Sequence, residues 1–228
     1  MIIRSGLIRN REGVAKERFD QHWREVHGPL ARVVPAMRAY AQNHVLACIA
    51  AGSDKLHRID GISQLWFDDV AAMSQAMASP EQAACVEDIK GFLDQVTIVI
   101  QSPGHWSHFG EQLATRAKVM AVLAGDPGDT ASYQGRLREW FGDTAIGGGS
   151  IRLNEVIERG YIVDRNVPRG NDVVAAIAEL WFNDPEEVHT ARTMVSLGDE
   201  AHSTECLSAL HVDEVRILEP IPDAPGPR

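Results

Sequence analysis

The sequence predicts an α+β protein made of two similar halves that pack against each other. One observation is the order of the expected elements, which runs strand, helix, strand, strand, helix, strand and then starts again. A second is an internal match, because residues 64–69 read QLWFDD and residues 179–184 read ELWFND. A third is the length of 228 residues, enough for one large domain or for two small ones of roughly 100 residues. A repeat of this size determines the architecture of the chain.

The first half is expected to open with a short apolar strand over 2–9, followed by a turn and a helix over 14–34. Proline lacks a backbone N–H, so Gly28-Pro29 should break or kink that helix. The helix is predicted from four residues that recur at helical spacing and share one face: Phe19, Trp23, His27 and Leu30.

The rest of the first half contains two internal strands, a divided helix and a closing strand. Asp68-Asp69 is expected to start the helix, and Pro80 to divide it. The strands are predicted over 37–49, 60–67 and 96–101, and the helical segments over 70–78 and 81–90.

The second half repeats this order. Its expected elements are a strand over 118–124, a helix over 132–141, strands over 151–158 and 173–182, a helix over 185–194 and a strand over 215–218. The order within each half is the split βαβ, or ferredoxin-like, pattern. One such unit leaves a sheet face uncovered, and two units can bury these faces against each other. We therefore expect two ferredoxin-like repeats forming an internal pseudo-dimeric α/β barrel.

The chain is accordingly divided into four parts. The first repeat is assigned to 1–104, a linker to 105–115, a second repeat to 116–220 and a flexible, proline-rich tail to 221–228.

Composition limits the partners and the compartment. The net charge of −10 disfavours nucleic acid and anionic membranes, which both require a basic face. Three widely spaced cysteines argue against a disulfide framework. The N-terminus lacks the apolar segment of a signal peptide, and no apolar run approaches the roughly 18 residues of a membrane span. A cytoplasmic protein with a small-molecule partner is the simplest interpretation.

No cofactor and no metal are expected. The sequence contains no GxSxG motif, no Walker loop and no dinucleotide glycine fingerprint. His22 and His27 are five residues apart, about 140° around an α-helix, whereas a metal-binding pair prefers a spacing of four. We therefore expect His22 to lie on the solvent side or behind His27, away from its pocket.

The candidate chemistry lies between Phe19 and Val45. His27 is near the end of the predicted helix, where it could act as a general acid or base or be a buried structural histidine. Tyr40, Gln42 and His44 alternate along a predicted strand and should share one face. That row could line a polar patch in an apolar cavity, or form a half-exposed strand face.

Two features recur in both halves and favour structural roles. Asn43 and Trp66 have counterparts in Asn154 and Trp181. Trp66 could still form one wall of the pocket. The sequence leaves open whether Glu155 or Glu179 of the second half reaches that pocket.

The run HWxxxHGPL from His22 to Leu30, followed by YxQNHV from Tyr40 to Val45, resembles the EthD-type branch of the dimeric α/β-barrel superfamily. The resemblance is good over the first repeat and holds only in outline over the second. The motif is lost there, because Arg136, Phe141 and Ile151 stand opposite His22, His27 and Tyr40.

The resemblance implies that His27 and Tyr40 are the catalytic residues. Proteins similar to this family include cofactor-free isomerases of methylated muconolactones, and related barrels include cofactor-free oxygenases and cyclases. Trp23, Gln42, His44 and Trp66 would then bind substrate.

Three functions remain open at this point. The first is a cofactor-independent isomerase or lyase, including decarboxylases, acting on an aromatic-derived acid or lactone in small-molecule catabolism. The second is a cofactor-free oxygenase or cyclase of a phenolic polyketide. The third is a non-catalytic ligand-binding barrel. The fused unit could also pair again as a homodimer.

Overall fold

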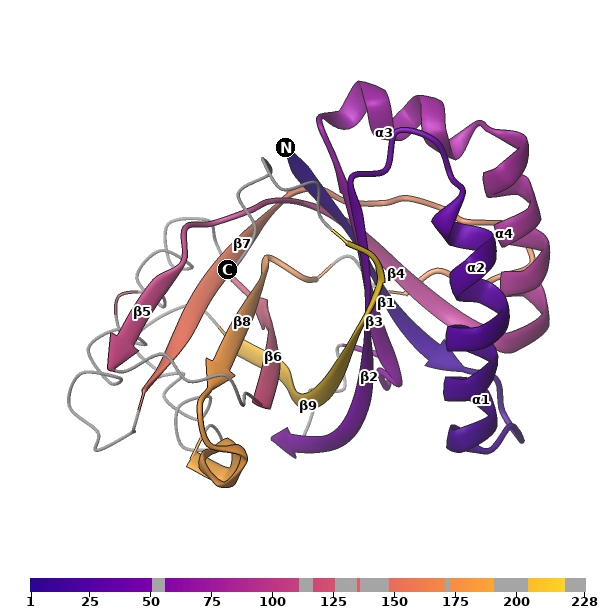
Figure 1. Ribbon diagram of the computed structural model, residues 1–228. Helices are drawn as coiled ribbons and strands as arrows, with labels where there is room; N and C mark the ends of the chain where they lie inside the picture. The colour runs from indigo at the N-terminus through magenta and orange to yellow at the C-terminus, as the bar shows by residue number, and fades with distance from the viewer. Residues whose placement is uncertain are drawn as a thin grey trace.

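The structure, a computed structural model, describes residues 1–50, 56–110, 117–125, 135, 148–170, 173–190 and 205–219. In this part of the chain, eight antiparallel strands close into a barrel in the order β4-β1-β3-β2-β9-β6-β8-β7, and β7 pairs back with β4 (Figure 1). A short ninth strand, β5, pairs with the other edge of β7. The barrel confirms the predicted fold class.

The strands are β1 Ile2–Asn10, β2 Ala39–Ala50, β3 Gly61–Phe67, β4 Leu93–Ser102, β5 Ser107–Gly110, β6 Ala117–Ala124, β7 Gly148–Glu158, β8 Ala176–Phe182 and β9 Glu205–Leu218. The helical elements are α1 Lys16–His22, a π-helical turn Trp23–His27, α2 Gly28–Arg32, α3 Val70–Met77, α4 Pro80–Phe92 and a 3-10 helix Pro185–Thr190.

The two halves have the same strand order. The first contributes β4-β1-β3-β2 and the second β9-β6-β8-β7, which is the ferredoxin-like order in each case. Their registers also correspond, since Asn43 pairs with Ile62 and Asn154 pairs with Ile177. The domain boundaries at 104 and 116 stay a prediction.

Capping residues explain where the helices of the first half begin. The Asp69 carboxylate accepts a hydrogen bond from the Ala72 N–H at 2.7 Å, which caps α3 as predicted. The Ser79 hydroxyl accepts one from the Gln82 N–H at 3.1 Å, and Pro80 occupies the first turn of α4. A Ser-Pro pair therefore ends one helix and starts the next.

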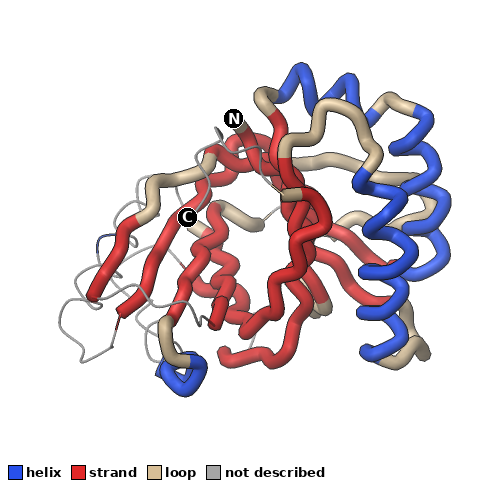
Figure 2. Tube along the Cα trace, viewed as in Figure 1, coloured by secondary structure: helices blue, strands red, loops and turns tan. Residues whose placement is uncertain are grey.

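Helices α1, α2 and α4 pack against one outer face of the barrel (Figure 2). An apolar core that includes Phe19, Trp23, Tyr40 and Phe92 fills the space between them and the sheet. A second core, with Leu7 and Val99 from one half and Met120 and Leu210 from the other, fills the barrel interior. Burial of both sheet faces holds the two halves together.

Some elements differ from the sequence prediction. β9 is much longer than the predicted 215–218, because it pairs with β2 on one side and with β6 on the other. β5 lies inside the predicted linker. Residues 185–190 of the predicted helix form a 3-10 helix. The helix expected over 132–141 lies outside the described residues except for position 135, and the tail 221–228 lies wholly outside them.

A polar network crosses the barrel interior. The Lys118 side chain is 1% exposed, and its ammonium lies 2.8 Å from a Glu179 carboxylate oxygen and also pairs with Glu214. Arg152 pairs with the same Glu179, and the Gln64 amide donates to it at 3.1 Å. Burial acts to raise the pKa of Glu179, but the adjacent Arg152 and Lys118 outweigh it and lower that pKa well below its ordinary value. Glu179 therefore forms part of the ion-pair network inside the barrel.

Candidate active site

The helix that carries His27 does not end at Gly28-Pro29. A π-helical turn, Trp23–His27, precedes the proline, and the helix then continues as α2. In that turn the Gly28 N–H donates to the Trp23 carbonyl, five residues earlier. The same carbonyl accepts a second hydrogen bond, at 2.7 Å, from the Gln42 amide on β2. The wider turn makes room for the Pro29 ring, so the expected break is replaced by a bulge. Bulges of this type occur frequently at functional sites.

The π turn brings His22 and His27 to one carboxylate. His22 Nε2 lies 2.8 Å from Oδ1 of Asp88, and His27 Nδ1 lies 2.9 Å from Oδ2. In a regular α-helix the two histidines would point about 140° apart. The expectation that they face different spaces is correct, but their shared partner was not foreseen.

Asp88 was missed in the sequence. It lies on α4, and its spacing from Cys85 and Phe92 puts it on the apolar stripe of that helix. A charged residue at such a position was the available signal. Burial acts to raise the pKa of Asp88, but hydrogen bonds with His27 and His22 outweigh it and lower the pKa.

An ionised Asp88 fixes the tautomer of His27. A carboxylate can only accept hydrogen bonds, so Nδ1 of His27 carries the proton and donates it. Nε2 is then the unprotonated nitrogen of the neutral ring, and among the described residues nothing bonds with it. This pairing of a carboxylate with an imidazole is the arrangement that orients a general base.

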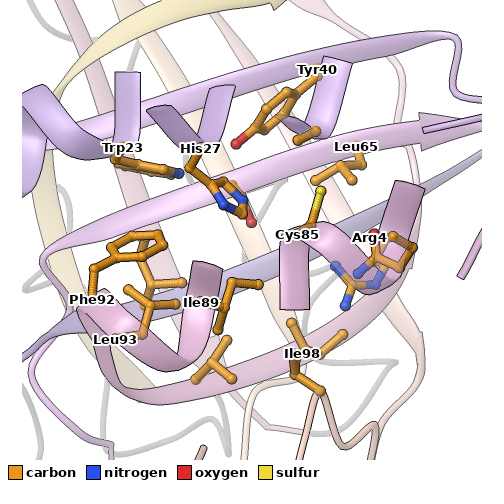
Figure 3. Close-up of a pocket in the computed structure, with 16 residues that line it drawn as sticks. Arg4, Trp23, His27, Tyr40, Leu65, Cys85, Ile89, Phe92, Leu93 and Ile98 are labelled. Carbon is orange, nitrogen blue, oxygen red and sulfur yellow. The ribbon is translucent and has the colours of Figure 1, made fainter. Parts of the chain in front are cut away.

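His27 lines an enclosed cavity between the helices and the outer face of the sheet (Figure 3). Its free volume is about 40 Å³, enough for a few water-sized groups. Most of the wall is apolar. The polar groups on it are Arg4, His27, Tyr40, Ser63, Gln82 and Cys85.

Tyr40 reaches the same cavity from β2 and is 1% exposed. Its oxygen accepts a hydrogen bond from the Gln42 amide at 3.1 Å, which leaves its own proton available to another acceptor. Burial raises the pKa of Tyr40 far above its ordinary value, and the side chains of Gln42 and Trp23 only partly oppose this. Tyr40 is therefore a hydrogen-bond donor throughout the neutral range.

Gln42 and His44 share the face of Tyr40, as predicted, but they do not line the cavity. The Gln42 Oε1 lies 3.1 Å from His44 Nε2, and the other ring nitrogen of His44 lies 2.8 Å from Asp20. The His44 ring also packs under Trp23, with 4.5 Å between ring centroids. These residues form a buried hydrogen-bonded chain that positions Tyr40 and the π turn.

Of the expected aromatic walls, Trp23 lines the cavity and Trp66 does not. Side chains alternate along β3, so Leu65 faces the helices and Trp66 faces the other side of the sheet. There Trp66 packs with Ile3, and the Arg216 guanidinium lies 5.9 Å from its ring centroid.

Cys85 also faces the cavity without being suited to nucleophilic chemistry. Burial and the charge of Asp88 raise the pKa of its thiol to about 11. The thiol therefore stays protonated at neutral pH, and it is the thiolate that reacts as a nucleophile.

The second half contributes to the cavity through a connecting segment, residues 159–170, between β7 and β8. Val163 lines the cavity, and Tyr161 packs against the same core. The segment is attached to β4, because Val96 N–H donates to Pro168 O at 3.1 Å and Gly170 N–H donates to Val96 O at 3.0 Å. Figure 1 shows it running from the end of β7 towards α4. Its displacement would give a ring-sized molecule more room.

His22 faces a separate open groove of about 660 Å³. Arg11 and Arg18 line this groove together with Asp88 and Phe92. Asp88 therefore lies between the two spaces, with His27 on the cavity side and His22 on the groove side.

Residues 11–96 match the family model described as the EthD domain. This range contains His22, His27, Tyr40 and Asp88. None of the curated proteins compared with the chain by sequence matches it.

Three of the solved structures that resemble this one illustrate the likeness. An anthrone oxidase-like protein superposes with a TM-score of 0.60 at 7% identity, covering 98% of this chain and 95% of its own. A protein from Fusobacterium nucleatum, provisionally described as a monooxygenase, gives a TM-score of 0.53 at 10% identity over 93% of each chain. An EthD family protein from Bacillus halodurans is 24% identical, with a TM-score of 0.36, over 45% of this chain and 98% of its own. The first two likenesses show the barrel fold.

Two features are absent from the described residues. They contain no cluster of three or more histidine, cysteine, aspartate or glutamate residues that could hold a metal ion. None of the helices among them is long and apolar enough to cross a membrane.

Proposed function

We propose that this protein is a cofactor-independent isomerase or lyase that acts on a small aromatic-derived acid or lactone. His27 is the general base and acid, Asp88 orients it, and Tyr40 stabilises developing negative charge. The observation that carries the proposal is the 2.9 Å contact between His27 Nδ1 and Asp88, which leaves His27 Nε2 unpaired at the cavity wall. The similar solved structures support only the coarser statement that this fold is used for small-molecule chemistry.

The proposed reaction begins with transfer of a proton from carbon. A C–H bond next to a substrate carbonyl breaks, and the proton moves to Nε2 of His27 while the electron pair moves to the carbonyl oxygen. The Tyr40 hydroxyl donates a hydrogen bond to that oxygen, and Asp88 stabilises the imidazolium. Return of the proton to a different carbon gives an isomer, and expulsion of a leaving group gives a lyase product. In decarboxylation, the bond between carbon and the carboxylate breaks instead, carbon dioxide leaves, and His27 that has taken up a proton from solvent delivers it to the carbon.

The surroundings of the cavity favour this chemistry. Trp23 and Phe92 close one end of it, and the two residues are almost fully buried. A largely apolar wall excludes water and strengthens the interactions of His27 and Tyr40 with a developing charge.

Deuterium incorporation tests the proposal directly. Unsaturated lactones and enolisable aryl-substituted keto acids would be incubated with the protein in D₂O, and exchange at carbon followed by NMR. We expect exchange with the unaltered protein and a loss of at least about 100-fold in His27→Gln. His105→Gln is the matched control, because His105 is exposed and lies outside the cavity.

Other outcomes would contradict the proposal. Exchange that is unchanged in His27→Gln removes the assigned base. Stoichiometric oxygen consumption with a bound substrate would support an oxygenase instead, and ring closure without oxygen consumption would support a cyclase. Tight ligand binding with neither exchange nor oxygen consumption would support a binding barrel.

A further inference from the structure

Arg4 is a cation on the cavity wall without a counter-ion. Within the part of the chain that the structure describes, no hydrogen bond or ion pair reaches its guanidinium. The titratable groups that act on it are Tyr161, Tyr40 and Cys85, and all three are neutral at pH 7. Burial lowers the pKa of Arg4 to about 10, so it still carries its charge at neutral pH.

The cations that are fully buried inside the barrel, unlike Arg4, are paired with carboxylates. Lys118 contacts the carboxylates of Glu179 and Glu214, and Arg152 contacts Glu179. Arg4 is half-buried, so its guanidinium has lost part of its surrounding water without gaining a counter-ion. An anionic ligand bound in the cavity would supply that counter-ion.

Gln82 provides a second unpaired polar group on the same wall. It lies in the first turn of α4, is 8% exposed and lines the cavity. Its backbone N–H binds the Ser79 hydroxyl, but among the described residues its side-chain amide has no partner. An amide can donate a hydrogen bond to a carboxylate oxygen that also accepts from a guanidinium.

We propose that Arg4 binds the carboxylate of the substrate, with Gln82 as a second donor to it. The inference rests on the proposed function, whose substrate class it narrows to monocarboxylic acids with an apolar body. Among the described residues that line the cavity, Arg4 is the only lysine or arginine, which favours a single negative charge. A guanidinium presents two parallel N–H groups that match the two oxygens of a carboxylate.

The arrangement also orients the substrate. Figure 3 shows Trp23 and Phe92 on one side of His27 and Arg4 on the other. A carboxylate at Arg4 therefore directs the apolar body towards the two aromatic rings and places the atoms between them beside His27 and Tyr40. A carboxylate held by Arg4 is stabilised as an anion and is not the group that leaves. Proton transfer or elimination elsewhere in the molecule is thus favoured over decarboxylation of that group.

Binding of simple carboxylates tests this site without knowledge of the substrate. Benzoate and propionate would each be compared with their neutral amides, benzamide and propionamide, by calorimetry and saturation-transfer NMR. We expect at least one carboxylate to bind at least about tenfold more tightly than its amide. Arg4→Met should remove this preference and leave amide binding unchanged, and Arg4→Lys should retain part of it.

Arg32→Met is the matched control. The substitution removes the same charge as Arg4→Met, but Arg32 is exposed on α2 and does not line the cavity. It should bind both ligands as the unaltered protein does. The proposed carboxylate anchor at Arg4 is overturned if neither carboxylate binds more tightly than its amide. It is also overturned if Arg4→Met or Arg4→Lys binds the carboxylate as tightly as the unaltered protein. Arg4→Lys keeps the cation and decides the matter if Arg4→Met does not fold.

His27→Gln separates this inference from the proposed function. It should abolish deuterium exchange while changing carboxylate affinity less than about threefold. If exchange depends on His27 but carboxylate binding does not depend on Arg4, the anchor fails and the acid–base proposal stands. If binding depends on Arg4 but no exchange depends on His27, the anchor stands as a ligand site and the proposed function fails.

Discussion

His22 and His27 bind the two oxygens of one carboxylate, that of Asp88, although they would diverge on a regular α-helix. The π-helical turn between them reduces the angle between the two side chains, so both reach Asp88. The result is a continuous connection from an open groove, through Asp88, to a cavity that contains Tyr40 and Arg4. The geometry around this connection, and the barrel beneath it, lead to testable predictions at Asp88, Tyr40, Gly61 and Lys118.

Asp88→Asn should reduce turnover strongly while leaving the fold intact. Asparagine has nearly the same shape, but it can present an N–H to His27 and so favour the tautomer that lacks a proton on Nδ1. We expect kcat to fall by about 100-fold or more with a much smaller change in KM. Steady-state kinetics beside circular dichroism would measure this. Full activity in the folded variant would show that Asp88 does not orient the base.

Asp88→Asn should also change how stability depends on pH. The pKa of Asp88 is lowered in the folded protein, so its contribution is complete above its ordinary value of 3.8 and is lost as pH falls through the folded pKa. Between pH 5 and pH 3, the variant should therefore lose less stability than the unaltered protein. Urea unfolding at several pH values would test this, and identical curves would contradict it.

Tyr40→Phe should lower kcat by about 100-fold, the effect of removing one donor to a developing oxyanion. The free energy of unfolding should fall by only about 1 kcal/mol, because Gln42 keeps its bond with the Trp23 carbonyl. Burial raises the pKa of Tyr40 above its ordinary value of 10.0, so the pH–rate profile of the unaltered protein should show no decline at pH 10 from its ionisation. A decline at pH 10 that disappears in Tyr40→Phe would contradict this assignment.

Gly61→Ala should destabilise the protein by about 1–3 kcal/mol, because the new methyl group overpacks the core. A Cβ at Gly61 would lie 2.4 Å from a ring carbon of Trp23, and that ring is buried. The change should alter tryptophan fluorescence and weaken ligand binding as Trp23 moves. Thermal unfolding and fluorescence would measure both effects.

Gly91→Ala is the control for Gly61→Ala and should have the opposite sign. Gly91 lies in α4, and a Cβ there would meet no atom within 4 Å. Alanine favours the helix, so the free energy of unfolding should rise by about 0.5 kcal/mol. Equal effects of the two substitutions would show that the Trp23 contact is unimportant.

Lys118→Met should destabilise the barrel by about 3–5 kcal/mol at pH 7, because it leaves two buried carboxylates without their shared cation. Glu179 and Glu214 have lowered pKa values in the folded protein, so their contribution is complete above 4.5 and is lost as pH falls. The difference between the two proteins should therefore shrink below about pH 4. Denaturant unfolding at pH 7 and pH 3 would measure it, and a pH-independent difference would contradict the assigned charges.

The sequence determined the elements of the first half and the duplicated strand order. Apolar periodicity, the Asp69 and Ser79 caps and the QLWFDD repeat depend on neighbouring residues, so local reasoning finds them. The shared face of Tyr40 and Gln42 follows in the same way from strand alternation. The length of β9 could not be predicted, because its partners β2 and β6 come from opposite halves.

The composition of the site depends on packing between elements that are distant in the sequence. Asp88, Arg4 and Val163 come from a second helix, the first strand and a segment of the other half, and no local spacing relates them to His27. The π turn depends on the Gln42 amide reaching the Trp23 carbonyl across the helix–sheet interface. Trp66 lies away from the cavity because its side chain is on the side of the sheet opposite the helices. Each of these results from packing between elements distant in sequence, and a periodic pattern records only the side chains of one element.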